Sequence, residues 1–215
     1  MRKRVYTNYI AKHIQSYSPI YSFIMVLFVM GIIFGAVIVN SLSVVQKEDL
    51  FYYLTHFFGQ VADGKTGSAE ELLKLSFFHN VKFTGLMWIL GISIIGFPLI
   101  LILLFLKGVV VGFSVGFLVN QMGWHGLLLA FVTLLPQNLL FIPVYIFIAV
   151  ISTAFSIKLM RKIFIRQGFS FYFVPEFARY SLSFIAAMAV ITLAASIEAF
   201  VAPVLMKSII VSISS

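Results

Sequence analysis

The sequence contains no cysteine and few charged residues. Without cysteine, the protein has no disulfide, no thiolate nucleophile and no cysteine-ligated metal. Only 10% of the 215 residues are charged, 61% are hydrophobic, and the mean hydropathy is +1.08. A soluble domain carries about 25% charged residues. The composition therefore excludes a water-soluble domain. It predicts an all-α integral membrane protein, because helices satisfy their own backbone hydrogen bonds in lipid.

Acidic residues are especially scarce, with 7 Asp and Glu against 15 Lys and Arg, which gives a net charge of +8. A positive charge is compatible with nucleic-acid binding, but here the basic residues flank long apolar runs. We therefore assign them to membrane topology and to contacts with lipid headgroups. No nucleic-acid partner is expected.

No pattern typical of an enzyme or a metal site is present. The four histidines, His13, His56, His79 and His125, lie in different segments. His56 and His79 lie in one polar segment near Asp63, Glu70 and Glu71, yet no short spacing such as His-x-x-x-His supports a metal site. No serine is paired in sequence with a basic residue that would activate it. We therefore expect a non-enzymatic protein without a metal or cofactor.

The apolar runs predict about five transmembrane helices. Their expected ranges are 20–39, 83–106, 108–122, 139–157 and 180–197. Residues 1–18 are basic and amphipathic and predict a helix on the inner leaflet. Residues 19–215 are predicted to form a single transmembrane domain.

The distribution of basic residues predicts that the N-terminus is inside and the C-terminus outside. In that orientation most of the 15 basic residues are cytoplasmic, many of them in a basic loop at 158–179. The expected cytoplasmic residues are Arg2, Lys3, Arg4, Lys12, Lys107, Lys158, Arg161, Lys162, Arg166 and Arg179.

An extracytoplasmic segment, 40–82, is predicted to contain two amphipathic helices, at 49–58 and 69–78. Ser68 is a plausible N-cap for the second helix, with Glu71 three residues later as in a capping box. Apolar side chains on these helices suit a partner, a second copy of the chain or the outer leaflet. The docking candidates are Phe51, Tyr52, Phe57, Phe58, Leu72, Phe77 and Phe78.

Two prolines and two amides interrupt the apolar run that extends from Lys107 to Lys158 without a charged residue. Between Gly126 and Ile157 a straight helix would be about 48 Å long, whereas the bilayer core is about 30 Å thick. We therefore predict a broken or re-entrant segment near Leu127–Pro143, with its motif at Pro136, Gln137, Asn138 and Pro143. The alternative is a helix that simply begins at the membrane interface near Pro136.

Small residues predict close helix packing at two places. Gly31 and Gly35 are four residues apart, and Gly108, Gly112 and Gly116 repeat at the same interval. Packing within one chain and association into a homo-oligomer are both compatible with this spacing. Glu198 is the one acid in a late apolar run, which marks it as a functional candidate. It could instead reach the outer interface or pair with Lys207 or Lys82.

Three motifs carry a resemblance to the stage II sporulation protein M family of bacterial membrane proteins. They are Asn80-Val81-Lys82, Lys107-Gly108-x-x-x-Gly112, and Leu135-Pro136-Gln137-Asn138-x-x-Phe141-Ile142-Pro143. The wider family is expected to carry Leu-Pro-His-Gly-x-x-Glu-x-Pro at the last motif. Here Gln137, Asn138 and Phe141 replace the His, Gly and Glu, so a proton-transfer role at that motif is not implied.

The resemblance implies a role in engulfment during endospore formation. A family member of this kind is an anchor at the sporulation septum and engulfing membrane. It recruits two peptidoglycan-degrading partners, stage II sporulation proteins D and P. Residues 40–82 are then the expected docking surface, because these partners act on the cell wall. The competing hypothesis is a small permease or channel subunit, alone or partnered with an ATPase, in which the broken segment at Leu135–Pro143 binds the substrate.

Overall fold

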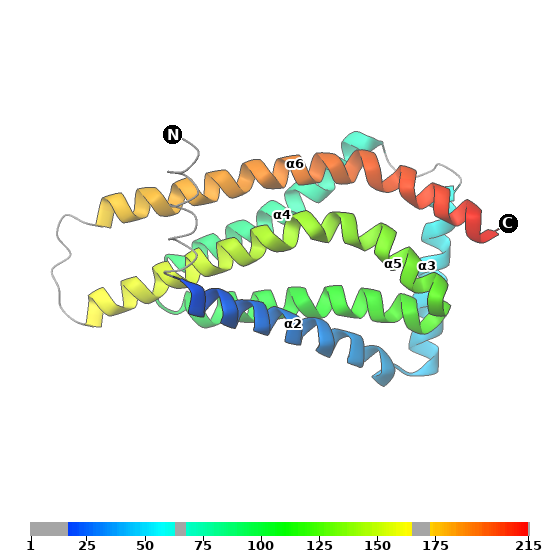
Figure 1. Cartoon of the computed structure of the whole chain (residues 1–215), viewed down its shortest axis with the longest axis horizontal. Coiled ribbons are helices and arrows are strands. Elements are labelled where there is room, and N and C mark those ends of the chain that lie inside the picture. The colour runs from blue at the N-terminus through cyan, green and yellow to red at the C-terminus, as the bar shows by residue number, and fades with distance from the viewer. Residues whose placement is uncertain (1–16, 63–67, 165–172, 215) are drawn as a thin grey trace.

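The computed structural model describes residues 17–62, 68–164 and 173–214, and within these ranges it contains helices and no strands (Figure 1). The predicted all-α class is therefore confirmed. The helices are α2 (Ser18–Ser41), α3 (Val44–Ala62), α4 (Ala69–Gly91), α5 (Gly96–Phe164) and α6 (Phe173–Ser214). The predicted helix over residues 1–18 lies almost entirely outside the described residues.

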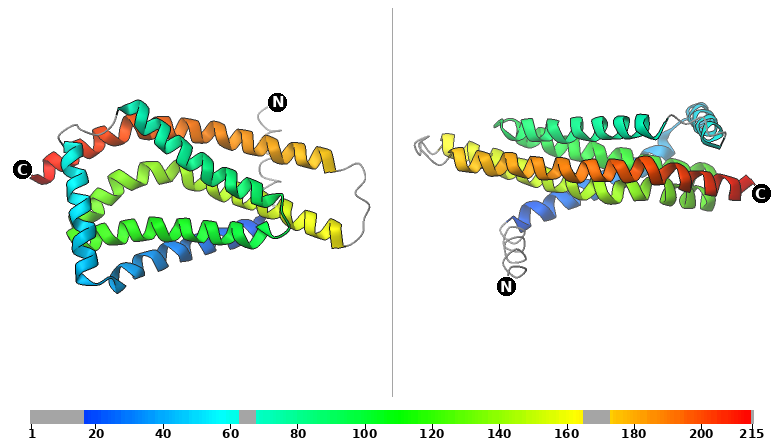
Figure 2. Two further views of the ribbon diagram at one scale, coloured as in Figure 1. Left: turned by 180° about the vertical axis from the view of Figure 1, so that it is seen from behind. Right: turned by 90° about the horizontal axis from the view of Figure 1, so that it is seen from above.

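The long helices lie side by side, and α3 crosses one end of the bundle (Figures 1 and 2). Helix α5 reverses direction at Gly123, where φ is 56° and ψ is −128°. Glycine adopts such a positive φ without steric cost, which explains the residue found at this reversal. The first segment of α5 (96–122) and its second segment (124–164) are consequently two separate passes along the bundle.

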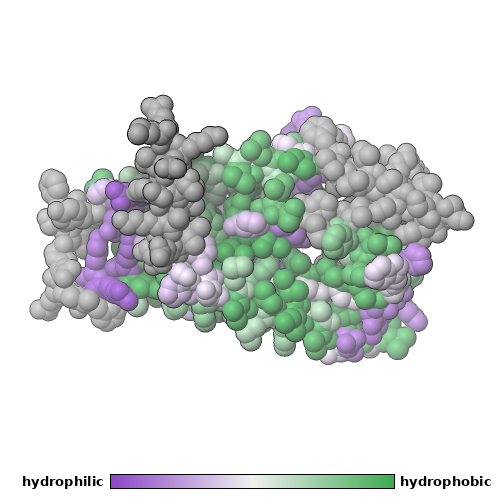
Figure 3. All heavy atoms as spheres, viewed as in Figure 1, coloured by the Kyte–Doolittle hydropathy of each residue, from purple (hydrophilic) through white to green (hydrophobic). Residues whose placement is uncertain are grey.

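Among the described residues, four segments are long and apolar enough to span a membrane: Ser18–Ser41, Gly96–Phe131, Asn138–Lys162 and Val174–Ala199. Helix α4 runs beside them but is more polar, with Glu70, Glu71, Lys74 and Lys82 in its sequence. Counting α4 as a pass gives five, in agreement with the predicted number. An apolar band separates two polar ends of the molecule (Figure 3), as expected of a membrane protein.

The second segment of α5 lies at the centre of the bundle. Tyr145, Ile148, Ala149 and Val150 are fully or almost fully buried there. The same core contains Ile24 of α2, Met87 of α4, Ile100 and Leu104 of the first α5 segment, and Ile191 of α6. All five passes therefore share one core, and outward-facing apolar side chains, such as those of α2, are left to contact lipid.

Both helices of the predicted outer segment begin with side-chain caps. The Ser68 hydroxyl accepts a hydrogen bond from the Glu71 backbone N–H, while Ser68 N–H donates to the Glu71 carboxylate, so the predicted capping box is confirmed. Ser43 and Gln46 make the same reciprocal pair at the start of α3. Each pair satisfies backbone N–H groups that the first turn of a helix leaves free.

The boundaries of the second and third predicted spans are wrong. Helix α4 continues from Ala69 to Gly91, so 69–82 belongs to a bundle helix instead of an outer loop. The chain turns back at 92–95, and α5 begins at Gly96, where a Cβ would lie 1.7 Å from the Leu90 carbonyl oxygen. The tight turn thus needs this glycine. Lys107, predicted to end a span, lies inside one.

The predicted break near Leu127–Pro143 is also wrong. Within α5 the non-helical backbone is at Gly123, whereas 124–164 is helical throughout. The Asn138 side-chain amide donates to the Leu134 carbonyl oxygen at 2.8 Å within this helix. Figure 1 shows that the second α5 segment is bent, as a helix containing proline commonly is. A bend accommodates the excess length that was predicted to require a break.

The two ends of the bundle differ in charge. Lys158, Arg161, Lys162 and Arg179 lie where α5 ends and α6 begins. The opposite end carries α3, with Lys47 offset by Glu48 and Asp49. By the positive-inside rule the first end is cytoplasmic and the α3 end is outside. These are called the inner and outer ends below.

Candidate functional site

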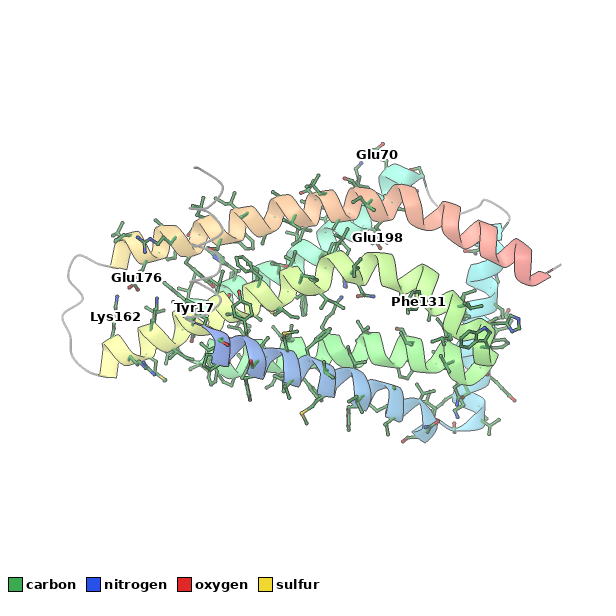
Figure 4. All side chains as sticks on the ribbon, viewed as in Figure 1. Tyr17, Glu70, Phe131, Lys162, Glu176 and Glu198 are labelled. Carbon is green, nitrogen blue, oxygen red and sulfur yellow. The ribbon has the colours of Figure 1, made fainter. Side chains whose placement is uncertain are left out.

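A polar cluster joins four passes of the bundle. It consists of Ser76 and Asn80 on α4, Lys107 and Tyr145 on the two segments of α5, and Glu198 on α6. Figure 4 labels Glu198, on the part of α6 that lies beside α4. Such residues are costly in lipid unless they bond to one another, so their convergence is the first candidate for a functional site.

Hydrogen bonds connect the members in a chain. The Ser76 hydroxyl donates to the Glu198 carboxylate, and the Tyr145 hydroxyl donates to the Asn80 side-chain oxygen. The Asn80 side-chain nitrogen donates to the Ser76 carbonyl and hydroxyl oxygens at 2.8 and 3.2 Å. The Thr84 hydroxyl donates to the Asn80 carbonyl oxygen at 2.8 Å. Buried Asn80 thus links α4 to the centre of the core.

Lys107 completes the cluster by electrostatics. Its ammonium nitrogen lies 5.2 Å from the ring centroid of Tyr145 and 5.5 Å from that of Phe83. It also attracts the Glu198 carboxylate. Aromatic faces and an opposite charge both stabilise an ammonium that has lost water. A lysine can therefore remain at this depth in the bundle. For this reason the prediction that a span ends at Lys107 was wrong.

The arrangement holds charge in place within the bundle. Glu198 is held by a serine hydroxyl and offset by a lysine, and Tyr145 is fully buried. Within the described residues no three His, Asp or Glu side chains come together as a metal site requires. The cluster is best suited to fixing the register of α4, α5 and α6.

The sequence singled out Glu198 but not its partners. Glu198 was predicted to be a functional residue, or else to face the outer interface or pair with Lys207 or Lys82. The structure places it against Ser76 and near Lys107. The side chain of Lys207 lies outside the described part of the structure. One signal was nevertheless present: Asn80 and Lys107 each belong to a motif that carries the family resemblance. Two of the three motifs therefore meet in the polar cluster.

The predicted packing glycines all lie between α2 and the first segment of α5. A Cβ on Gly31 would lie 2.5 Å from the Phe105 carbonyl oxygen, and one on Gly35 would lie 2.1 Å from that of Val109. We call this contact the glycine seam; it comprises Gly31, Gly35, Gly108, Gly112 and Gly116. Because these glycines are occupied within one chain, they do not form the surface of the predicted homo-oligomer.

The docking candidates do not form one surface. Tyr52 and Phe78 are exposed, Phe51 and Leu72 are half-buried, and Phe77 packs against the main core. The side chains of Phe57 and Phe58 lie outside the described part of the structure. Tyr53, which is not among the predicted docking residues, is the more exposed neighbour of Tyr52. The two tyrosine rings contact each other edge to face, with centroids 6.0 Å apart.

The predicted broken-helix motif is not assembled as a site. The side chains of Pro136 and Gln137 lie outside the described part, Asn138 bonds within its own helix, and Pro143 is exposed in the bent helix. The discontinuous helix on which the permease hypothesis depended is absent from 124–164.

The inner end contains a second group of aromatic and hydroxyl residues. The Tyr180 hydroxyl donates to the Trp88 carbonyl oxygen at 2.6 Å and lies 3.0 Å from the Ser152 hydroxyl. The Phe155 and Tyr180 rings stack with centroids 4.3 Å apart. These contacts hold the start of α6 against α4 and α5.

The fold and the polar cluster define a multi-pass helical membrane protein whose buried polar groups join its passes. The sequence pattern of the family described as Stage II sporulation protein M matches residues 24–203, which is most of the chain. The protein therefore belongs to this family of sporulation-related membrane proteins, and the suspected resemblance is confirmed. The family is not known as a family of enzymes. Neither the curated proteins nor the solved structures contain a significant match.

Proposed function

We propose that this protein is a non-enzymatic anchor at the sporulation septum and engulfing membrane, where it recruits peptidoglycan-degrading partners for engulfment. The expected partners are stage II sporulation proteins D and P. The observation that carries the proposal is α3, a helix that crosses the outer end of the bundle (Figure 1). It presents two exposed tyrosines.

Helix α3 is held to the bundle on one face. Leu54 packs against the buried residues Leu118, Leu129 and Ala130 of the two α5 segments. A side chain fixed in this way limits the rotation of α3 about its own axis. The opposite face is therefore presented to the outside in a defined orientation, as a docking surface requires.

The free face of α3 is rich in residue types that dominate protein interfaces. Tyr52 and Tyr53 have exposed fractions of 67% and 71%. Tyrosine supplies a large contact area and a hydroxyl, and it is enriched among the residues that contribute most to binding. Because wall hydrolases work outside the membrane, a tyrosine pair at the outer end is a suitable place to hold them.

The experiment replaces both tyrosines by serine and measures how much of the two hydrolases is recovered with the full-length protein from sporulating cells. Loss of two central interface residues is expected to reduce recovery at least tenfold. The matched control is Val44→Ser with Val45→Ser, a similarly exposed apolar pair at the start of the same helix.

Recovery equal to that of the unchanged protein would contradict the assignment of α3 as the docking surface. Recovery that falls equally in the valine control would mean that α3 binds lipid nonspecifically through its apolar residues. The amount of each variant in the membrane fraction is measured in parallel, because docking can be judged only for protein that has inserted.

A further inference from the structure

We propose that the inner end of the bundle contains a binding site for the phosphate headgroup of an anionic phospholipid. A cleft of about 410 Å³ lies between the end of α5 and the start of α6. Its volume is within the range of small-molecule pockets, roughly 300–1,000 Å³. Figure 4 labels Tyr17, Lys162 and Glu176 at this end of the molecule.

The cleft combines cations with apolar walls. Lys158 of α5 and Arg179 of α6 line it together with the hydroxyl-bearing residues Tyr180 and Ser183. Ile151 and Leu182 are among its apolar lining residues. An ammonium and a guanidinium from facing helices match a phosphate, while the apolar wall matches the adjoining acyl chain.

The two cations are available for a ligand. Glu176, which also lines the cleft, makes its salt bridge with Lys162 at 3.3 Å. Within the described residues neither Lys158 nor Arg179 forms a salt bridge; Lys158 instead lies 5.7 Å from the Tyr17 ring centroid. In sequence, Glu176 is the one acid between Glu71 and Glu198. The cleft therefore has positive charge that the described chain does not neutralise.

The occupant of the cleft is a lipid and not residues 1–16 or 165–172 of the same chain, because both of these segments are positively charged. Residues 1–16 contain Arg2, Lys3, Arg4 and Lys12 and no acid, and residues 165–172 contain Arg166 and no acid. Neither segment complements a cationic cleft. Leu182 is 65% exposed, so the wall that it forms continues onto the lipid-facing surface. A phospholipid in the inner leaflet can therefore place its headgroup in the cleft from the bilayer.

The floor of the cleft is rigid enough to form a site. Phe155 and Tyr180 line the cleft and stack on each other, and the Tyr180 hydroxyl is fixed by the Trp88 carbonyl oxygen. The Ser183 hydroxyl donates to the Arg179 carbonyl oxygen at 3.0 Å. Preorganised walls reduce the entropy that a headgroup site would otherwise lose on binding.

Native mass spectrometry of the detergent-purified full-length chain tests the site. Binding of phosphatidylglycerol is compared with binding of phosphatidylcholine that has identical acyl chains. The unchanged protein should prefer phosphatidylglycerol, and Lys158→Gln with Arg179→Gln should weaken this lipid's binding about 25-fold, from about fivefold for each basic group. The charge-matched control, Lys47→Gln with Lys74→Gln at the other end, should retain the preference.

Equal loss in the charge-matched control would overturn the site, because it would show a diffuse effect of net charge. A second variant, Ser183→Phe, fills the cleft without changing its charge and should also remove the preference. If it does not fold, Leu182→Trp blocks the same wall from its exposed side. Retained preference with a filled cleft would contradict the proposal, as would displacement of the lipid by inorganic phosphate or glycerol 3-phosphate at millimolar concentration.

Discussion

The glycine seam and the polar cluster hold different parts of the same bundle by different physical means. In the seam, α2 approaches the first α5 segment so closely that the Gly31 and Gly108 positions would each place a Cβ 2.5 Å from a backbone oxygen. In the cluster, α4, α5 and α6 are joined by hydrogen bonds and by the attraction between Lys107 and Glu198. Both contacts lie within one fold.

The difference matters because lipid provides no hydrophobic force between helices. Van der Waals contact and buried polar bonds are what remain to hold helices together. The seam is held by the close fit of two helix backbones, so an atom added to one of its glycines must displace the backbone of the facing helix. The cluster uses matched donors, acceptors and charges, so the removal of one partner leaves another unpaired. The seam should therefore be sensitive to enlarged side chains, whereas the cluster should be sensitive to the removal of a charge or a hydrogen-bonding group.

The largest effect is expected from enlarging the seam with Gly35→Ala and Gly112→Ala together. The new methyl groups would lie 2.1 Å from the Val109 carbonyl oxygen and 1.9 Å from that of Ile32. Because both obstacles are backbone atoms, α2 must separate from α5, at a combined cost of about 5 kcal/mol. Such a loss approaches the whole stability of a small protein. Thermal unfolding in detergent and membrane abundance measure it.

The matched control for the seam is Gly85→Ala on α4. A Cβ at this position meets only the tip of the Phe184 ring at 3.9 Å, which is ordinary contact. Alanine is the better helix former, so this variant should be unchanged or more stable by about 0.5–1 kcal/mol. A loss at Gly85 as large as the loss at the seam would contradict close approach as the reason for the seam glycines, because helix propensity alone predicts a gain for each Gly→Ala variant.

The next effect is expected from removing the attraction between Lys107 and Glu198, which acts across the polar cluster without a salt bridge between the two side chains. Lys107→Met should destabilise the protein by about 3 kcal/mol, since Glu198 is then left without its compensating charge. Glu198→Gln removes the other charge and retains an amide that can bond Ser76. The double variant should lose less stability than the sum of the single losses, because neither charge remains. Strict additivity across this cycle would argue against any coupling between Lys107 and Glu198.

Much of the fold was predictable because it depends on local and compositional signals. Low charge and long apolar runs predicted a helical membrane protein, the Ser68–Glu71 spacing predicted a capping box, and glycine spacing predicted close packing. Each of these signals depends only on residues that are close together in the sequence, and each follows from general rules of helix geometry. The structure contains the helices, the cap and the close contacts that these signals predicted.

The errors arose where a distant contact changed the meaning of a local signal. Lys107 reads as the end of a span until Tyr145 and Glu198, far away in sequence, supply an environment for its charge. Pro136 suggests a break, yet the chain remains helical from 124 to 164. The polar cluster could not be assembled from sequence because its five members come from three helices.

A moderate effect is expected from Tyr145→Phe, which tests the hydrogen bonds of the cluster apart from its charges. The variant loses the hydroxyl that donates to Asn80 and keeps the ring that contacts Lys107 and Phe83. A buried hydrogen bond of this kind contributes about 1–2 kcal/mol. Chemical unfolding in mixed micelles measures the change, with the exposed Tyr53→Phe as control. A loss no larger than that of the control would leave charge and packing as the whole basis of the cluster.

The smallest effect is expected from Asn138→Leu, which separates a bent helix from a broken one. In the structure Asn138 donates one hydrogen bond to the Leu134 carbonyl oxygen, which belongs to the same helix. Leucine removes that bond but preserves an apolar, helix-forming side chain, so the stability loss should be about 0.6 kcal/mol. If the amide instead held together the free ends of a discontinuous helix, several orphaned backbone groups would face lipid, and the loss would exceed about 3 kcal/mol. Unfolding measured beside Tyr145→Phe under identical conditions distinguishes the two cases, and a loss larger than that of Tyr145→Phe would contradict the continuous helix.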